Sequence, residues 1–198
     1  MHDRNRRLLE AARRGDAAEV RAALDAGASV EARDAELRSP LLLASLGSHV
    51  EAARVLVAAG ADPNAQDRRS DSAWLVTGVT GSVPMMRVLL PAGPDVTLRN
   101  RFGGVSLIPA SERGHVAYVR AVLRETDIDV NHVNDLGWTA LLEAVILGDG
   151  ELPHQEIVEL LITAGARPDL ADADGVTPLR HAERRGFDTI AALLRAVS

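Results

Sequence analysis

The chain has 198 residues, of which 46% are hydrophobic but only 3% aromatic, so a core has to be built from Ala, Leu and Val. All 22 basic residues are arginine, which excludes a Schiff-base lysine and the lysine of a Walker-type phosphate loop. The absence of cysteine excludes disulfides, thiolate catalysis and cysteine-ligated zinc. The net charge of −6 argues against a nucleic-acid partner, and no apolar run approaches the roughly 20 residues of a membrane span.

One sequence pattern returns six times along the chain. Its first residue is Arg6, Ser39, Ser72, Val105, Thr139 or Thr177, and an apolar residue follows two positions later in each copy. A small residue stands five positions after the first residue, and a Gly or Ser stands nine positions after it. The spacing is 33 residues at first and lengthens towards the end of the chain. This period indicates stacked units, each of which buries its apolar face only against its neighbours.

The second half of most copies has apolar residues at helical spacing, as in Ala53, Leu56 and Val57. Several of these segments end in a glycine, the residue best suited to the left-handed end of a helix: Gly27, Gly60, Gly93 and Gly165. Each unit is therefore predicted to be two antiparallel helices and a turn-rich connector. Residues 1–198 are predicted to form a single domain, because length does not imply extra domains in a stack of repeats.

Individual repeats depart from the pattern in informative ways. Repeat one starts with the polar pair Arg6-Arg7, whereas repeat three has Trp74 at the position that is Leu in the other repeats. Repeat five carries five additional residues around 149–153, which are either functional or a tolerated surface loop. In repeat six, Glu183 and Arg195 stand where inner repeats have small or apolar residues. Polar ends of this kind predict a complete, capped array.

These repeats resemble the ankyrin repeat. The residues that carry the resemblance are Asp174-Gly175-Val176-Thr177-Pro178-Leu179, Ser39-Pro40-Leu41, Leu141-Leu142-Glu143-Ala144 and Gly60-Ala61-Asp62-Pro63-Asn64. The His that usually follows the Leu is absent, and Thr-Pro is complete only in repeat six. The resemblance covers essentially the whole chain and implies an all-α ankyrin-repeat solenoid of six helix-turn-helix units with hairpin-like connecting loops. Residues 71–150 are also similar to small bacterial ankyrin-repeat proteins.

The residues that could carry chemistry are scattered. No pair of the six histidines has the i, i+4 spacing with an intervening Glu that a helical zinc site requires, and His49 and His115 are expected to make local hydrogen bonds. Asp169, Asp172 and Asp174 lack the Glu that would complete a calcium loop, so they are predicted to form turns and cap helices. We expect no catalytic residue, no cofactor and no metal, and hence no enzyme.

The resemblance implies that function lies in protein–protein interaction, through a concave groove and the turn tips of repeats three to five. The candidate partner-binding residues are Arg68, Arg69, Asp71, Arg101, Phe102, Asp135, Leu136, Trp138, Ile146 and Leu147. Exposed aromatic and apolar residues mark partner sites, and the arginines favour an epitope that is acidic as well as apolar. Alternatively, the apolar residues of repeat five pack under its longer loop.

A small-molecule site or an enzyme using the groove near residues 148–153 is the second interpretation. We expect a cytoplasmic monomer that binds a protein of unknown identity and neither nucleic acid nor membrane.

Overall fold

The computed structural model describes residues 3–197, and this stretch holds twelve α-helices, one 3-10 helix and no β-strand. The predicted all-α class is therefore confirmed. The chain divides into two compact units, Met1–Arg101 (unit 1) and Phe102–Ser198 (unit 2). Unit 1 contains α1 (Asp3–Arg14), α2 (Ala17–Asp25), α3 (Pro40–Leu46), α4 (Val50–Ala58), α5 (Leu75–Thr80), α6 (Val83–Leu89) and η1 (Leu90–Ala92). Unit 2 contains α7 (Leu107–Glu112), α8 (Val116–Glu125), α9 (Ala140–Ile146), α10 (Leu152–Thr163), α11 (Pro178–Arg185) and α12 (Asp188–Arg195).

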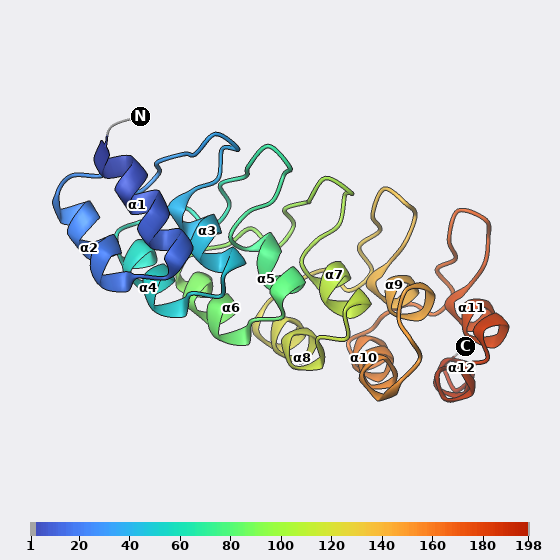
Figure 1. Cartoon of the computed structure of the whole chain (residues 1–198). Coiled ribbons are helices and arrows are strands. Elements are labelled where there is room, and N and C mark those ends of the chain that lie inside the picture. Colours follow the sequence, from blue (N-terminus) through green and yellow to red (C-terminus); the bar gives the residue numbers. More distant parts are fainter. Residues whose placement is uncertain (1–2, 198) are drawn as a thin grey trace. The chain divides into compact units, whose positions relative to one another are not determined.

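The helices of each unit form consecutive pairs, one pair per sequence repeat. In unit 1 the first helices α1, α3 and α5 pack side by side, and the second helices α2, α4 and α6 form a second row. In unit 2 the first helices are α7, α9 and α11, and the second helices are α8, α10 and α12. Figure 1 shows a long hairpin-like loop leading into the first helix of each pair after α1. The turn at the end of each of these loops is called its tip below.

The polar residue that opens several repeats is a helix cap. Ser39 Oγ accepts a hydrogen bond from Leu42 N (3.1 Å), Thr139 Oγ1 accepts one from Leu142 N (3.2 Å), and Thr177 caps α11 in the same way. Such caps satisfy backbone donors that the first turn of a helix leaves unpaired. Repeat one has no Ser or Thr there, and α1 already begins at Asp3, three residues before Arg6.

The break between the two helices of a pair is a left-handed residue in most repeats, as at Ser48 (φ 53°) and Gly114 (φ 72°). In repeat two, the His that follows the break connects neighbouring repeats, because His49 Nε2 donates a hydrogen bond to the carbonyl oxygen of Arg13 (3.1 Å). The local hydrogen bond expected of His49 is confirmed.

The core consists of small and aliphatic side chains with few rings. Trp74 is completely buried, as its place in the repeat predicts, and Ala110 and Ala144 are completely buried in α7 and α9. Small residues at these positions let adjacent helices approach closely. Within residues 3–197, no helix combines the length and the apolar character needed to cross a membrane.

Candidate functional site: the loop tips and the first helix of repeat five

One acidic or amide side chain organises the tip of four loops. Its Oδ1 atom accepts hydrogen bonds from the backbone N–H groups two and four residues later. In repeat five, for example, Asn134 Oδ1 accepts from Leu136 N and Trp138 N, each at 3.0 Å. The equivalent residues in the other repeats are Asp34, Asp67 and Asp172. These bonds fix the conformation of the turn. The residue two positions after the acid or amide therefore has a defined place at the tip.

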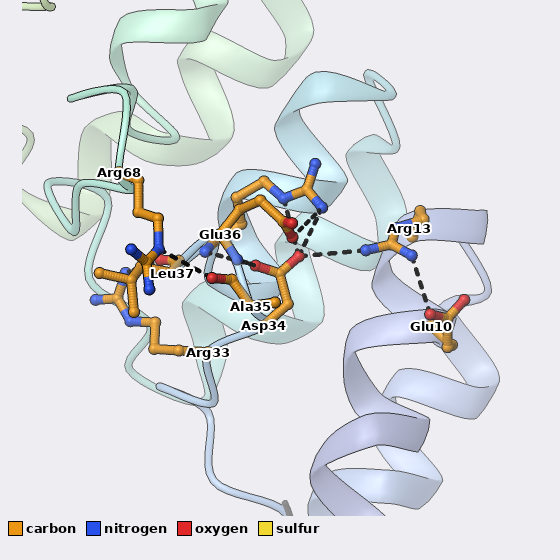
Figure 2. Close-up of polar contacts among 9 residues, drawn as sticks. Glu10, Arg13, Arg33, Asp34, Ala35, Glu36, Leu37 and Arg68 are labelled. Atoms are coloured by element: carbon orange, nitrogen blue, oxygen red, sulfur yellow. Dashed lines mark hydrogen bonds and ion pairs between the residues drawn. The ribbon is translucent and has the colours of Figure 1, made fainter.

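In unit 1 two arginines near the tips donate to backbone carbonyl groups, Arg33 within its own loop and Arg68 to the neighbouring loop. Arg68 Nε donates to the carbonyl oxygen of Ala35 (3.0 Å), and Arg33 Nη1 donates to that of Leu37 (2.9 Å). Figure 2 shows these contacts beside the network in which Arg13 joins Asp34 (3.3 Å) to Glu10 (3.0 Å). Arg68 is thus a structural link as well as a candidate contact residue.

The pKa of the Asp71 carboxyl in unit 1 is subject to opposing effects. Partial burial raises the pKa of its carboxyl, and the negative charge of Asp67 acts in the same direction. The positive charges of Arg69 and Arg101 oppose that rise. Arg68 and Arg69, the predicted basic residues of this tip, are exposed, as is Arg101 in the loop of repeat four.

In unit 2 the tips of repeats four and five present adjacent apolar side chains. Phe102 is 50% exposed and Leu136 is 53% exposed, and each lies three residues before the first residue of its repeat. The two tips are joined through the backbone, because Asp135 N donates to the carbonyl oxygen of Phe102 (2.9 Å). The structure therefore brings Phe102, Asp135 and Leu136 together at one edge of unit 2. We call these three residues the apolar tip.

The other predicted contact residues of repeat five differ in exposure. Leu147, which follows α9, is 48% exposed, whereas Trp138 and Ile146 are partly buried. Val133, which the sequence pattern did not single out, is 46% exposed in the same loop. Trp138 is thus a weaker candidate for a contact residue than its position in the repeat suggested.

The insertion of repeat five does not cover Leu147. Leu152 and Pro153, two of the five additional residues, form the first turn of α10 and are exposed, which corrects the prediction that all of 149–153 is loop. Gly150 lies so close to the Phe187 ring that a side chain there would collide with it.

His154 anchors this insertion. Its Nε2 donates to the carbonyl oxygen of Glu112 (2.9 Å), and its Nδ1 lies 2.7 Å from Asp149 Oδ1. The bond to Glu112 is the counterpart of the bond between His49 and the carbonyl of Arg13. A sequence signal for it existed: without 149–153, Gly148 and His154 align with Ser48-His49 and Gly114-His115.

Glu143 in α9 is the functional candidate that sequence reasoning missed. It is 6% exposed, and its Oε1 accepts a hydrogen bond from Asn134 Nδ2 (2.9 Å). Burial raises the pKa of Glu143 to about 7, and the nearby charge of Glu112 adds to the rise, whereas Asn134 and Arg113 oppose it. Asn134 therefore connects a buried, titratable carboxyl group to the turn that carries Leu136.

Of the acidic residues near the end of the chain, Asp172 forms a turn, as predicted, whereas Asp169 pairs with Arg167 and the N-cap of α11 is Thr177, contrary to the expected acidic cap. Asp172 accepts two backbone hydrogen bonds, and its Oδ2 lies 2.6 Å from His181 Nε2. These contacts lower the pKa of Asp172, the backbone bond from Val176 most of all. Among residues 3–197, no three His, Asp or Glu side chains gather as a set of metal ligands.

The fold and the tips define a class of protein: a tandem array of helix pairs whose connecting loops present side chains at hydrogen-bonded tips. Family models agree in detail, since the model for three copies of the ankyrin repeat matches residues 75–172 and the single-repeat model matches residues 36–68. The chain belongs to the ankyrin-repeat family. Ankyrin repeats are generally protein–protein interaction modules, and proteins built from them are generally non-enzymatic scaffolds.

Solved structures share both sequence and fold with this chain. The ankyrin repeat domain ABAYE2397 of Acinetobacter baumannii AYE is 46% identical with a TM-score of 0.91, and the match covers 96% of each chain. The ankyrin repeat protein EF0377 is 36% identical with a TM-score of 0.92, over 97% of this chain and 98% of the other. The ankyrin repeat domain of Bcl-3, a member of the IkappaB family, is 25% identical with a TM-score of 0.84, over 96% and 85% of the two chains.

Matches to curated proteins are shorter. YahD of Escherichia coli (strain K12) is 53% identical over 95 residues, which are 48% of this chain and 47% of YahD. The ankyrin repeat-containing protein nipk-1 of Caenorhabditis elegans is 40% identical over 81 residues. That match covers 37% of this chain and 13% of nipk-1, so the chain spans less than half the length of either relative.

Proposed function

We propose that the chain is a protein-binding module that contacts its partner through the apolar tip of unit 2. The observation that carries the proposal is the pairing of Phe102 and Leu136, each about half-exposed, at equivalent positions of two hydrogen-bonded loop tips. Burying a large apolar side chain contributes about 1.5–3 kcal/mol, and aromatic anchors dominate many interfaces.

The backbone supports such a role because it is already ordered. Asn134 holds the turn that carries Leu136 through two hydrogen bonds, and the Asp135–Phe102 bond fixes one tip against the other. A surface that is ordered before binding loses less conformational entropy when the partner docks. In unit 1, Arg69 and Arg101 would contribute through charge, which affects the rate of association more than the lifetime of the complex.

The experiment is selection of peptides from a random dodecapeptide library on the full chain, followed by affinity measurements on variants. We expect Phe102→Ala and Leu136→Ala each to weaken binding by about 2 kcal/mol, in the range of interface hot spots. The matched control is Leu152→Ala, because Leu152 is 72% exposed at the start of α10 and lies outside the apolar tip. Equal losses in Leu152→Ala and Leu136→Ala would contradict the proposed site, and circular dichroism would verify that every variant is folded.

The second candidate, a small-molecule site or an enzyme near residues 148–153, gains no support from this geometry. His154 and Asp149 contact each other, but the remaining nitrogen of His154 is bound to the backbone of Glu112. A shallow depression of about 280 Å³ lies elsewhere, in unit 1, and is lined by Arg54, Val57, Ala58, Arg87, Val88 and Pro91. That lining offers no pair of side chains for acid–base catalysis.

A further inference from the structure

Glu143 occupies a position that is apolar in repeats two to four. It stands four residues after Thr139, where repeats two, three and four have the buried residues Leu43, Val76 and Pro109. A carboxylate at such a position loses hydration on folding, and this loss is costly unless the group gains partners. The question is therefore what compensates the charge of Glu143.

Among residues 3–197, Glu143 has one neutral hydrogen-bond partner and no ion-pair partner. Asn134 Nδ2 donates to Oε1, whereas within residues 3–197 no hydrogen bond reaches Oε2, an oxygen that is not sealed from solvent. Arg113, whose positive charge acts on Glu143, itself forms an ion pair with Glu112 at 2.6 Å. Neutral donors stabilise a carboxylate less than a charged one does.

In repeat six, the positions equivalent to Asn134 and Glu143 carry an acid and an imidazole. There the residue that holds the tip is Asp172, the helix residue is His181, and the two lie 2.6 Å apart. In repeat five the residue that holds the tip is the amide Asn134, and the helix residue is the acid Glu143. The acid of repeat five thus pairs with a neutral amide, whereas the acid of repeat six pairs with an imidazole.

We infer that the Glu143 carboxylate receives a basic side chain, Arg or Lys, from a partner protein segment whose apolar residue contacts Phe102 and Leu136. This inference rests on the proposed function. Asn134 joins the two subsites, because it donates to Glu143 and accepts from the backbone N–H of Leu136. The occupant is a basic-plus-apolar segment, in contrast to the acidic-plus-apolar epitope expected from the arginines of unit 1.

Binding of this kind is coupled to the loss of a proton from the Glu143 carboxyl. A cation favours the ionised carboxylate, so occupation lowers the pKa of Glu143 from about 7. Below that pKa the group is neutral and the attraction is lost, whereas above it the attraction is complete. For one proton and a non-titrating Arg, affinity should rise by about tenfold between roughly pH 6 and 8.

Other charged groups surround α9 and require a control. On α7 they are Glu112 and Arg113, on α10 His154, whose Nε2 bonds to the carbonyl of Glu112, and on α11 His181 and Arg185. The pH dependence must therefore be shown to disappear with Glu143 itself.

The experiment uses the full chain and synthetic Arg-containing peptides from the dodecapeptide selection, carried out at pH 8. Fluorescence anisotropy gives Kd at pH 6 and pH 8 for the wild type, Glu143→Gln and the matched control Glu159→Gln, an exposed residue of α10. We expect enrichment of Arg or Lys near an apolar residue, and binding to the wild type about tenfold tighter at pH 8. Glu143→Gln should lose at least tenfold at pH 8 together with its pH dependence, whereas Glu159→Gln should retain both; thermal melts verify folding.

The possible failures are distinguishable. If the selected peptides lose affinity with Leu136→Ala but bind Glu143→Gln as tightly as the wild type, the inference is overturned and the proposed function stands. The inference is also overturned if the pH dependence persists in Glu143→Gln, because a histidine would then be responsible. If no peptide depends on Leu136, or none is selected, both the proposed function and the inference are wrong.

Discussion

A single backbone position in the loop tips explains several residues that the repeat pattern left unexplained. The residue two positions before the start of repeats two to six has a positive φ in every case: Leu37 (64°), Ser70 (59°), Gly103 (73°), Gly137 (79°) and Gly175 (73°). Glycine adopts this conformation without steric cost, whereas an L-residue such as Leu loses about 1–2 kcal/mol. Unit 1 thus carries strain at two tips where unit 2 uses glycine.

Leu37→Gly should stabilise the protein, by about 0.5–1 kcal/mol, because relief of strain exceeds the greater chain entropy of glycine. The Leu37 side chain is 45% exposed, so little packing is lost. The matched control is Gly137→Ala: an added Cβ would make only ordinary contact with Ala173, so strain alone should destabilise this variant by about 1 kcal/mol. Urea denaturation measures both changes, and a destabilised Leu37→Gly would show that the leucine side chain outweighs its backbone strain.

At the scale of the helix, the insertion of repeat five lengthens α10, the second helix of its pair, as well as the loop before it. α10 has 12 residues, whereas α4 has 9 and α8 has 10. His154 keeps the inter-repeat contact of its repeat although it now lies in the first turn of the helix, and the Asp149 side chain caps Glu151 N (3.0 Å). The additional residues are therefore accommodated without loss of the contact between repeats four and five.

Deletion of residues 149–153 should consequently be tolerated. The shortened chain has the spacing of Ser48-His49, and closing a shorter loop changes the entropy by less than about 1 kcal/mol. His154→Ala should be more harmful, by about 1–2 kcal/mol, because the partly buried carbonyl of Glu112 would lose its partner. Chemical denaturation of both variants tests this order, and a deletion that destabilises more than His154→Ala would show that the inserted residues are integral to unit 2.

The sequence predicted the helix pairs well because their determinants are local. Caps such as Ser39 and Thr139, the small residues Ala110 and Ala144, and the glycines at helix ends are recognisable from spacing alone. Glu143 could not be recognised, because a Glu on a short helix is usually solvated, and its hydrogen-bond partner Asn134 lies nine residues away in the preceding loop. Likewise, the role of Arg68 depends on a carbonyl of the neighbouring loop, which spacing does not reveal.

At the scale of the whole molecule, a stack of similar helix pairs presents an end surface on which a further pair could dock. Within each unit, a helix pair packs mainly on the pairs next to it, so a terminal pair has one face without a neighbour among the described residues. In α12 this face carries Arg195, which pairs with Glu183 of α11 at 2.7 Å, and both side chains remain about half-exposed. The equivalent residues of inner repeats, Leu24, Val57 and Leu123, are half-buried aliphatics. Charge at the terminal position therefore discourages another helix pair from docking there.

Arg195→Leu should leave stability nearly unchanged and increase self-association. The lost ion pair is exposed, and such pairs contribute about 0–1 kcal/mol, whereas the new leucine adds exposed apolar surface at the end of α12, two residues before the exposed Val197. Light scattering across a concentration series measures association, and urea denaturation measures stability. The matched control is Arg180→Leu, since Arg180 is exposed on α11 and stands outside this ion pair. If Arg195→Leu scatters no more than Arg180→Leu, the charge of Arg195 does not protect the end of the array.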